Sequence, residues 1–121
     1  MKYVRVYSDE TGQSHFAEME MRLAPAIHSL AMPAVEASEP QAARRFVVLR
    51  LPAGWHAEWH PAPAYQYICV LSGEAELTVG DGERRRFSGG DVLHLRDISG
   101  RGHATRVIGE QDLLIAVVEE A

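Results

Sequence analysis

Apolar and polar residues alternate with a period of two along most of this chain. Over residues 17–23 every second residue is apolar and the residues between are charged, as in a strand with one buried face. Residues 74–79 repeat this pattern, Gly80-Asp81-Gly82 supplies a turn, and residues 83–87 supply the returning strand. Short strands between turn residues are typical of a sandwich or barrel. We expect strands near residues 46–51, 55–60, 66–72, 74–79, 83–87, 92–96, 103–108 and 112–119.

Residues 24–44 interrupt the alternation. They carry Pro25, Pro33 and Pro40 among alanines, and proline removes backbone donors and ends helices. The segment is expected to be a surface connection with at most one short helical turn. The chain should form one domain, in which residues 1–44, as N-terminal strands and this connection, pack on a barrel made by residues 45–121.

Composition excludes several classes of partner. The 121 residues hold 12 basic and 17 acidic side chains, a net charge of −5, which disfavours nucleic acid and anionic lipid as partners. The single cysteine, Cys69, allows no intramolecular disulfide. Neither a signal peptide nor an apolar run of membrane-spanning length is visible. We therefore expect a cytoplasmic protein with no membrane partner.

Histidine is the residue type that suggests chemistry. His56, Glu58 and His60 lie two residues apart and would share one face of a strand. Residues at that spacing are separated by roughly 6.6 Å, so Glu58 and His60 could converge on one ion, whereas His56 lies further along the strand. The alternative is that these histidines are half-buried strand residues without a ligand. His15 and His28 precede the barrel and are expected to be solvated or capping.

Two stretches of the chain resemble the cupin superfamily. The first motif of cupins reads Gly-x5-His-x-His-x3/4-Glu-x6-Gly, and here Ala62 stands at its second histidine and Gln66 at its glutamate. The run Phe87-Ser-Gly-Gly-Asp91-Val-Leu-His-Leu is similar to the start of the second motif, and His103 falls where that motif places a histidine. The matching positions of the first motif are Gly54, His60, Ala62, Gln66 and Gly73.

The resemblance covers nearly the whole chain and is nearest to small single-domain bacterial cupins of unassigned function. It implies an all-β fold, a jelly-roll β-barrel with N-terminal strands added, and a homodimer. It also implies a small-molecule site in the barrel lumen. Strand parity places Cys69 and His94 on the opposite face from the lumen.

The resemblance implies a degenerate metal site. Cupins hold Fe, Mn, Ni or Zn with three imidazoles and a carboxylate, and this chain retains His60, Gln66 and His103 with no ligand at Ala62. Glu58 would compensate in part if it faces the same lumen. The site therefore either binds such a divalent metal weakly or serves as a metal-free pocket lined by the same groups.

Two functions remain open from the sequence. In the first, the protein is an enzyme of isomerase, lyase or metal-dependent oxygenase type, with His60, His103 and Glu58 as acid–base residues. In the second, it is a non-catalytic protein that binds or senses a metabolite. In both, His56, Tyr65 and Gln66 are the further candidates for ligand contact.

Overall fold

The computed structural model describes residues 1–26 and 31–121, and the expectation for His28 falls outside them. The described residues form strands joined by turns and loops, with no helix among them and hence none that could span a membrane. The alternation of apolar residues explains this all-β fold, because each strand buries one face. The strands are β1 (Lys2–Ser8), β2 (Ser14–Glu20), β3 (Ala24–Ala26), β4 (Val35–Ala37), β5 (Ala43–Leu51), β6 (His56–His60), β7 (Gln66–Ser72), β8 (Glu74–Thr78), β9 (Arg84–Ser88), β10 (Val92–Arg96), β11 (His103–Ile108) and β12 (Leu113–Glu120).

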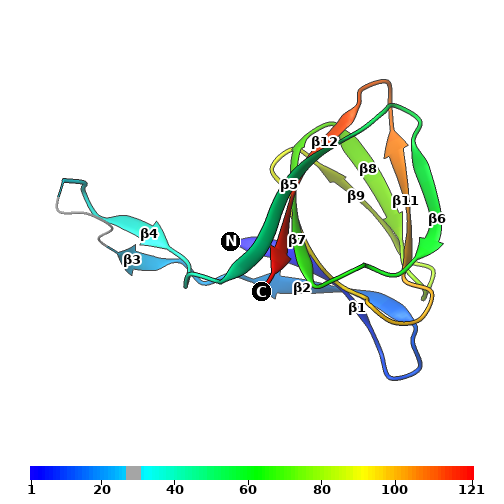
Figure 1. Cartoon of the computed structure of the whole chain (residues 1–121), viewed down its shortest axis with the longest axis horizontal. Helices are drawn as coiled ribbons and strands as arrows, with labels where there is room; N and C mark the ends of the chain where they lie inside the picture. Colours follow the sequence, from blue (N-terminus) through cyan, green and yellow to red (C-terminus); the bar gives the residue numbers. More distant parts are fainter. Residues whose placement is uncertain (27–30) are drawn as a thin grey trace.

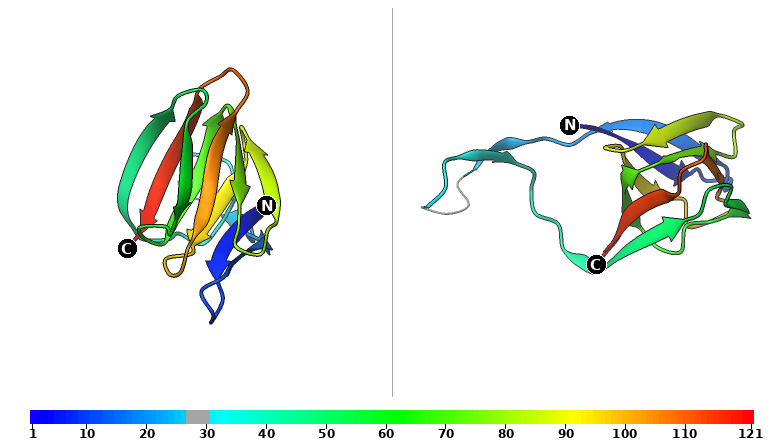
Figure 2. Two further views of the ribbon diagram at one scale, coloured as in Figure 1. Left: turned by 90° about the vertical axis from the view of Figure 1, so that its right-hand side faces the viewer. Right: turned by 90° about the horizontal axis from the view of Figure 1, so that it is seen from above.

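Two sheets make the barrel (Figure 1). A six-stranded sheet has the order β2-β1-β10-β7-β12-β5, and a four-stranded sheet has the order β6-β11-β8-β9. All pairs are antiparallel except β1 with β10, which run parallel. Figure 2 shows the two sheets facing each other across the interior. This is the barrel that the turn spacing predicts.

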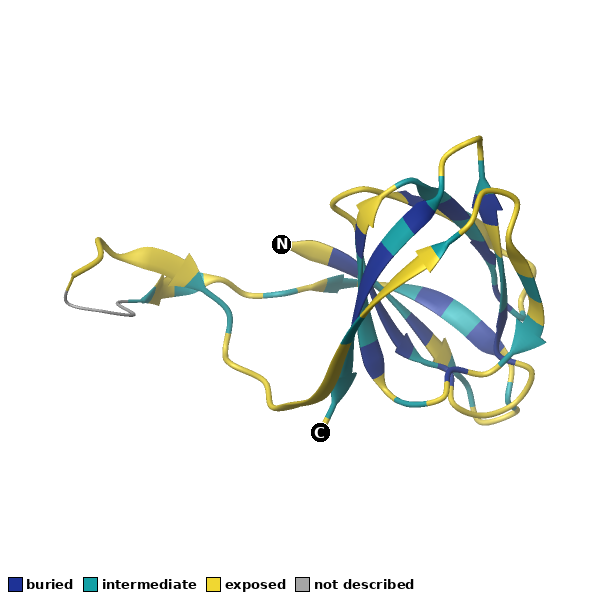
Figure 3. Cartoon of the chain, turned by 45° about the horizontal axis from the view of Figure 1, so that its top comes forward, coloured by how far each residue is buried: buried dark blue, intermediate teal, exposed yellow. Residues whose placement is uncertain are grey.

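The core fills the space between the two sheets. Inward residues of the large sheet meet inward residues of the small one, for example Phe16 and Phe87, whose ring centroids are 6.1 Å apart. Burial of these aliphatic and aromatic side chains is the main stabilising contribution to such a fold. Figure 3 shows that buried positions concentrate in the barrel. The buried cluster comprises Val6, Phe16, Ala62, Val70, Ala75, Leu77, Val79, Phe87, Leu93, Leu95, Val107, Leu113, Ile115 and Val117.

The N-terminal region departs in part from expectation. β1 and β2 pair onto the barrel through β10, but β2 covers Ser14–Glu20 instead of residues 17–23. Residues 24–26 and 35–37 form a two-stranded hairpin that pairs only with itself and extends away from the barrel (Figures 1 and 2). Within its described residues the connection contains no helical turn. Pro25 is tolerated in β3 because proline lacks a backbone N–H, and the outer edge of this hairpin has no neighbouring strand that would need one.

Candidate functional site

His60 and His103 lie side by side. β6 and β11 are antiparallel neighbours that place these residues opposite each other, and their ring centroids are 4.7 Å apart with a tilt of 55°. Gly102 makes this approach possible, because a Cβ on it would overlap the carbonyl group of His60. Its positive φ of 73° is also a conformation that glycine adopts at little cost. The structure thus brings together the two imidazoles identified in the sequence.

Asp97 is a third member of this site that sequence analysis missed. It is fully buried, and its Oδ2 lies 2.5 Å from Nδ1 of His103, which is itself 3% exposed. Its other oxygen, Oδ1, is the one fully buried side-chain oxygen or nitrogen without a hydrogen-bond partner in the described part of the chain. Asp97 stands just after β10, and its carbonyl accepts a hydrogen bond from the backbone N–H of Ala62. Burying a carboxylate costs free energy unless it is paired, and the imidazole of His103 supplies that partner.

In both histidine rings, Nδ1 is hydrogen-bonded and, among the described residues, Nε2 is not. Nδ1 of His103 donates to Asp97, and Nδ1 of His60 donates to the carbonyl of Glu58 at 2.7 Å. These contacts fix the tautomer in which Nε2 carries the lone pair. Neither Nε2 atom makes a hydrogen bond within the residues described. The pair can therefore accept a proton or a hydrogen bond from a bound molecule.

Glu58 does not join this pair, so the parity argument for it was wrong. The β6–β11 ladder is shifted between His103 and Thr105, where three steps along β6 match two steps along β11. Such a bulge reverses strand parity. Glu58 and His56 are exposed and line a groove of about 220 Å³ on the outer face of the four-stranded sheet, together with Glu76 and Arg106.

Gln66 opens into a separate pocket. The pocket has a volume of about 480 Å³ and lies where β5, β7 and β12 meet the loop before β7. Gln66 is 9% exposed, and within the described residues its amide makes no hydrogen bond, to the two histidine rings or to any other group. Apolar residues form most of the wall, namely Val47, Leu49, Pro63, Ala64, Ile68, Ile115 and Val117.

Charged groups stand at the edge of the Gln66 pocket. Glu119 lies opposite Gln66 in the β7–β12 ladder, and its carboxylate lies 3.2 Å from Arg44 and 3.8 Å from Arg45. Glu119 is largely buried, whereas both arginine side chains are mostly exposed. The pocket is thus apolar inside, with one free amide and an ion-paired rim.

Tyr65 belongs neither to the histidine pair nor to the Gln66 pocket. The guanidinium of Arg96 stacks over its ring at 4.1 Å, and both residues line a surface hollow with Arg5 and Tyr7. The structure therefore assembles only part of the expected ligand set. His60 and His103 meet, Gln66 lines a pocket, and Tyr65, His56 and Glu58 face outward.

The donors present do not fit the metal site of a typical cupin. Ala62 is buried and has no side-chain donor atom, and Gln66 makes no hydrogen bond to either ring within the described residues. The carboxylate of Asp97 is engaged by His103. Among the residues that the structure describes, no group of three or more His, Cys, Asp or Glu is arranged to hold a metal ion. Two imidazoles alone are a weak donor set for a divalent cation.

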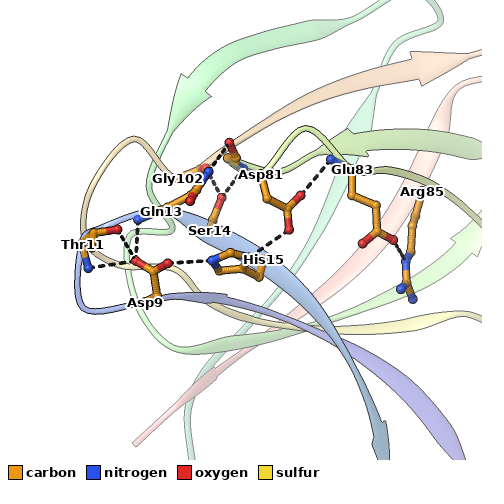
Figure 4. Close-up of polar contacts among 10 residues, drawn as sticks. Asp9, Thr11, Gln13, Ser14, His15, Asp81, Glu83, Arg85 and Gly102 are labelled. Carbon is orange, nitrogen blue, oxygen red and sulfur yellow. Dashed lines mark hydrogen bonds and ion pairs between the residues drawn. The ribbon is translucent and has the colours of Figure 1, made fainter.

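A second histidine cluster lies at the start of β2, where the hydroxyl of Ser14 donates to the carbonyl of Gly102 (Figure 4). Nε2 of His15 lies 2.7 Å from Asp9, and Nδ1 lies 2.9 Å from Asp81. Only the doubly protonated ring can donate to both carboxylates, and these contacts raise the pKa of His15 above 6.5. Asp9 also accepts from Thr11 and Gln13, which with the His15 contact holds its pKa far below the usual value. The sequence expectation of a solvated or capping His15 missed this cluster, because Asp81 is distant in the chain.

His94 is buried on the outer face of the six-stranded sheet. Its parity was predicted correctly, but it is only 2% exposed, stacked on Tyr67 at 4.2 Å. Its Nδ1 accepts from Arg5, and its Nε2 donates to Glu120, each at 3.1 Å. Burial lowers the pKa of His94, so the neutral ring that these contacts require is favoured.

Comparison with known proteins identifies the family. A family model described as a cupin domain matches residues 47–119, which is most of the chain. No curated protein matches. A cupin 2 conserved barrel domain protein from Salinispora arenicola is similar at 22% identity and a TM-score of 0.53, covering 84% of this chain and 76% of its own. The cupin domain of Cnp3 from Schizosaccharomyces pombe is similar at 18% identity and a TM-score of 0.50, covering 89% and 73% respectively. At such identities these structures support the fold alone, and with the family match they show that this chain belongs to the cupin domain family.

Proposed function

We propose that this protein binds a small, mainly apolar molecule carrying one polar group in the pocket lined by Gln66. The observation that carries the proposal is the amide of Gln66, which is nearly buried, makes no hydrogen bond within the described residues and faces a pocket of about 480 Å³. This amide is not engaged within the described part of the protein, so a ligand seated against the apolar wall can exchange water for a direct hydrogen bond with it. Pockets of this size with aliphatic walls and few polar groups are typical of small-molecule sites.

The rim favours a ligand with an acidic or hydrogen-bonding end. Arg44 and Arg45 share the carboxylate of Glu119 at the pocket edge. A ligand carboxylate or phenol can form a charge-assisted hydrogen bond with one of these arginines, while the apolar part of the ligand displaces water from the pocket wall. The amide of Gln66 both donates and accepts, so it accommodates a carbonyl or a hydroxyl.

The binding proposal is tested with a panel of short aliphatic and aromatic carboxylic acids, their amides and phenols. Thermal shift is the first measurement, followed by calorimetric titration of each compound that raises the melting temperature. Gln66→Leu, which keeps the side-chain volume and removes the amide, should weaken binding about tenfold. His56→Ala, in the outer groove, is the matched control and should bind as the wild type does. A panel without any binder, or binding equal in Gln66→Leu, would refute the proposal.

A second candidate function is acid–base chemistry at the histidine pair. The observation that favours it is the contact of Asp97 with Nδ1 of His103, which orients the ring and stabilises it when Nε2 accepts a proton. His103 would take a proton from the carbon next to a carbonyl and return it at a neighbouring position, as an isomerase requires. In a lyase, the same proton abstraction would be followed by loss of a leaving group from the β-carbon, and the imidazolium would protonate that group. His60 would hold the carbonyl oxygen or return the proton.

This chemistry has a direct test that needs no knowledge of the substrate. In deuterated water, the protein should speed exchange of the proton next to the carbonyl in small ketones and keto acids, followed by NMR. His103→Asn should remove the effect, and His56→Asn should leave it unchanged. Equal exchange with wild type and His103→Asn would eliminate this candidate while leaving the binding proposal intact.

A further inference from the structure

Arg5 and Arg96 line one hollow on the outer face of the six-stranded sheet. Arg5 lies on β1 and Arg96 is the last residue of β10, and the parallel ladder between these strands pairs Arg5 with His94 and Tyr7 with Arg96. Alternate residues of a strand share a face, so the two arginines are diagonal neighbours on the face that also carries His94. The hollow has a volume of about 440 Å³ and includes Tyr65 from the loop before β7.

Neither of these arginines has an acidic partner. Six other arginines of the described chain form ion pairs with Asp or Glu at 2.6–3.8 Å, and the three remaining ones, Arg22, Arg84 and Arg101, are exposed. Arg5 and Arg96 are half-buried, yet no carboxylate contacts either of them within the described residues. A charge that is partly withdrawn from water and unpaired costs free energy. A bound anion would therefore stabilise these two arginines in particular.

Each of the two guanidinium groups is oriented by a ring. Nε of Arg5 donates to Nδ1 of His94 at 3.1 Å, which leaves both terminal nitrogens of Arg5 without an acceptor among the described residues. The guanidinium of Arg96 stacks over the ring of Tyr65 at 4.1 Å, and stacking uses its face while its N–H groups remain free in the plane. Side chains held in this way lose less conformational entropy when a ligand binds.

His94 engages the carboxylate beside this site. Because Nδ1 of His94 accepts from Arg5, its Nε2 carries the ring proton and donates to Glu120 at 3.1 Å. Among the described residues that line the hollow, none is acidic. The hollow therefore carries two positive charges and no negative one.

The rest of the hollow is uncharged and partly aromatic. Tyr7 and Tyr65 line it and are 37% and 36% exposed, and exposed aromatic rings offer a stacking surface to a planar group. Ala17 lies opposite Arg5 in the β1–β2 ladder, and its small side chain leaves space beside the guanidinium group. The site thus joins two cationic groups to a wall that suits a ring.

We propose that this hollow binds a small molecule that carries a phosphate group, with Arg5 and Arg96 contacting the phosphate oxygens and the two tyrosines contacting the rest of the ligand. A phosphate monoester carries a charge of about −1.5 to −2 at pH 7, which matches two guanidinium groups better than a carboxylate does. The net charge of −5 disfavours a long polyanion, so the expected ligand has a single phosphate group. This site is separate from the Gln66 pocket and does not depend on it.

The first test is calorimetric titration with phenyl phosphate, whose ring and phosphate group match the two parts of the site. The wild type should bind one molecule, and Arg5→Gln and Arg96→Gln should each weaken binding about 10–100-fold, because each removes charge-assisted hydrogen bonds. Arg50→Gln is the matched control, since it also removes one positive charge but lies on β5 beside Asp112, and it should bind as the wild type does. The melting transition of each variant shows whether the barrel remains folded.

The second test separates a defined site from general attraction between charges. Phenyl sulfate has the same shape with a single negative charge and should bind several-fold more weakly. Arg96→Lys keeps the charge but loses the planar group that stacks on Tyr65, so it should also weaken binding of phenyl phosphate several-fold. Gln66→Leu alters the other pocket and should leave this binding unchanged. Phosphatidylcholine vesicles that contain phosphatidic acid present the same phosphate group on a surface and should not retain this acidic protein.

Four results would overturn the proposal. The first is no binding of phenyl phosphate at millimolar concentration. The second is binding that Arg5→Gln and Arg96→Gln leave unchanged, or that Arg50→Gln weakens equally. The third is loss of binding in Gln66→Leu, which would place the phosphate in the pocket already described. The fourth is retention on the vesicles that Arg96→Gln abolishes, which would assign the arginines to a lipid headgroup. A failure of ligand binding at Gln66 would leave all of these outcomes unaffected.

Discussion

Nε2 of His15 lies 2.7 Å from the carboxylate of Asp9, and this contact is one half of a bridge between two turns of the barrel. The other half runs from Nδ1 of the same ring to Asp81 in the β8–β9 turn. Gln13 adds a hydrogen bond from its amide to the carbonyl of Gly80. His15 thus joins the β1–β2 hairpin to the small sheet, and the bridge is complete only when the ring is protonated.

The bridge predicts a pH-dependent stability. The pKa of His15 is raised above 6.5 by its two carboxylate partners, so its contribution is full below pH 6.5 and is lost as pH rises through the raised value. The pKa values of Asp9 and Asp81 are lowered, so their contribution is present above about pH 3.8 and is lost on acidification. The bridge is therefore strongest between these limits. We expect His15→Gln to lower the melting temperature there by a few degrees, on the order expected for exposed ion pairs.

The measurement is the melting temperature of wild type and His15→Gln from pH 4 to pH 9. The difference between the two proteins should shrink above neutrality, which separates His15 from the other groups that titrate. His56→Gln, an exposed histidine without a carboxylate partner among the described contacts, should show no such trend. A constant difference across the range would contradict the bridge.

The strands of the barrel could be predicted from the sequence because, in a strand with one buried face, every second residue is apolar. The strand expected at residues 103–108 is β11, and the strand expected at 112–119 is β12 within one residue at each end. The meeting of His60 and His103 also followed, because both positions match the motifs of the family. In each case the information is local or carried by a motif.

The rest of the site depends on contacts between distant residues. Asp97 lies in a loop and has no pattern to identify it, and its role comes from its position beside His103. Glu58 was misplaced because a bulge depends on how two strands pair, which period-two counting cannot report. The bridge of His15 needs Asp81, more than sixty residues away. These features arise in the folded barrel and not in any segment of it.

Asp97 provides a stability prediction. Asp97→Ala removes the acceptor for Nδ1 of His103 and leaves a buried polar group unpaired. We expect the free energy of unfolding to fall by about 2–4 kcal/mol. Asp97→Asn retains an oxygen acceptor of similar shape and should cost less. Urea denaturation measures both, and an Asp97→Ala protein as stable as the wild type would show that the pair contributes nothing to folding.

Metal binding should be weak in the wild type. Among the described residues, only His60 and His103 offer free imidazole nitrogens at the site. Calorimetric titration with Ni or Zn should therefore give a shallow isotherm that His60→Ala abolishes. Ala62→His supplies a further imidazole next to this pair and should raise the affinity about 10–100-fold. Because Ala62 is buried, the larger side chain should also destabilise the metal-free protein by about 1–3 kcal/mol.

His56 provides the control for the metal titration. His56→Ala changes an exposed histidine of the outer groove and should leave the weak isotherm unaltered. Tight stoichiometric binding by the wild type, retained in both His60→Ala and His103→Ala, would place the metal site elsewhere.

Gly102 sets how closely the histidine strands approach, and it allows a matched comparison with Gly54. Both glycines have positive φ, 73° and 81°, so alanine at either position adopts a strained backbone at a cost of about 1–2 kcal/mol. A Cβ at Gly54 meets no atom within 4 Å, whereas a Cβ at Gly102 overlaps the backbone of His60 and Pro61. Gly102→Ala should therefore lower the free energy of unfolding by about 2–5 kcal/mol, because overpacking adds to the strain.

The two alanine variants should also differ at the site itself. In Gly102→Ala the backbone of His60 must move, so the NMR signals of both imidazole rings should shift, and any proton exchange by His103 should fall. In Gly54→Ala the ring signals should match the wild type, since the residue touches neither histidine. Equal losses of stability in the two variants would mean that backbone strain alone, and not contact with His60, requires glycine at position 102.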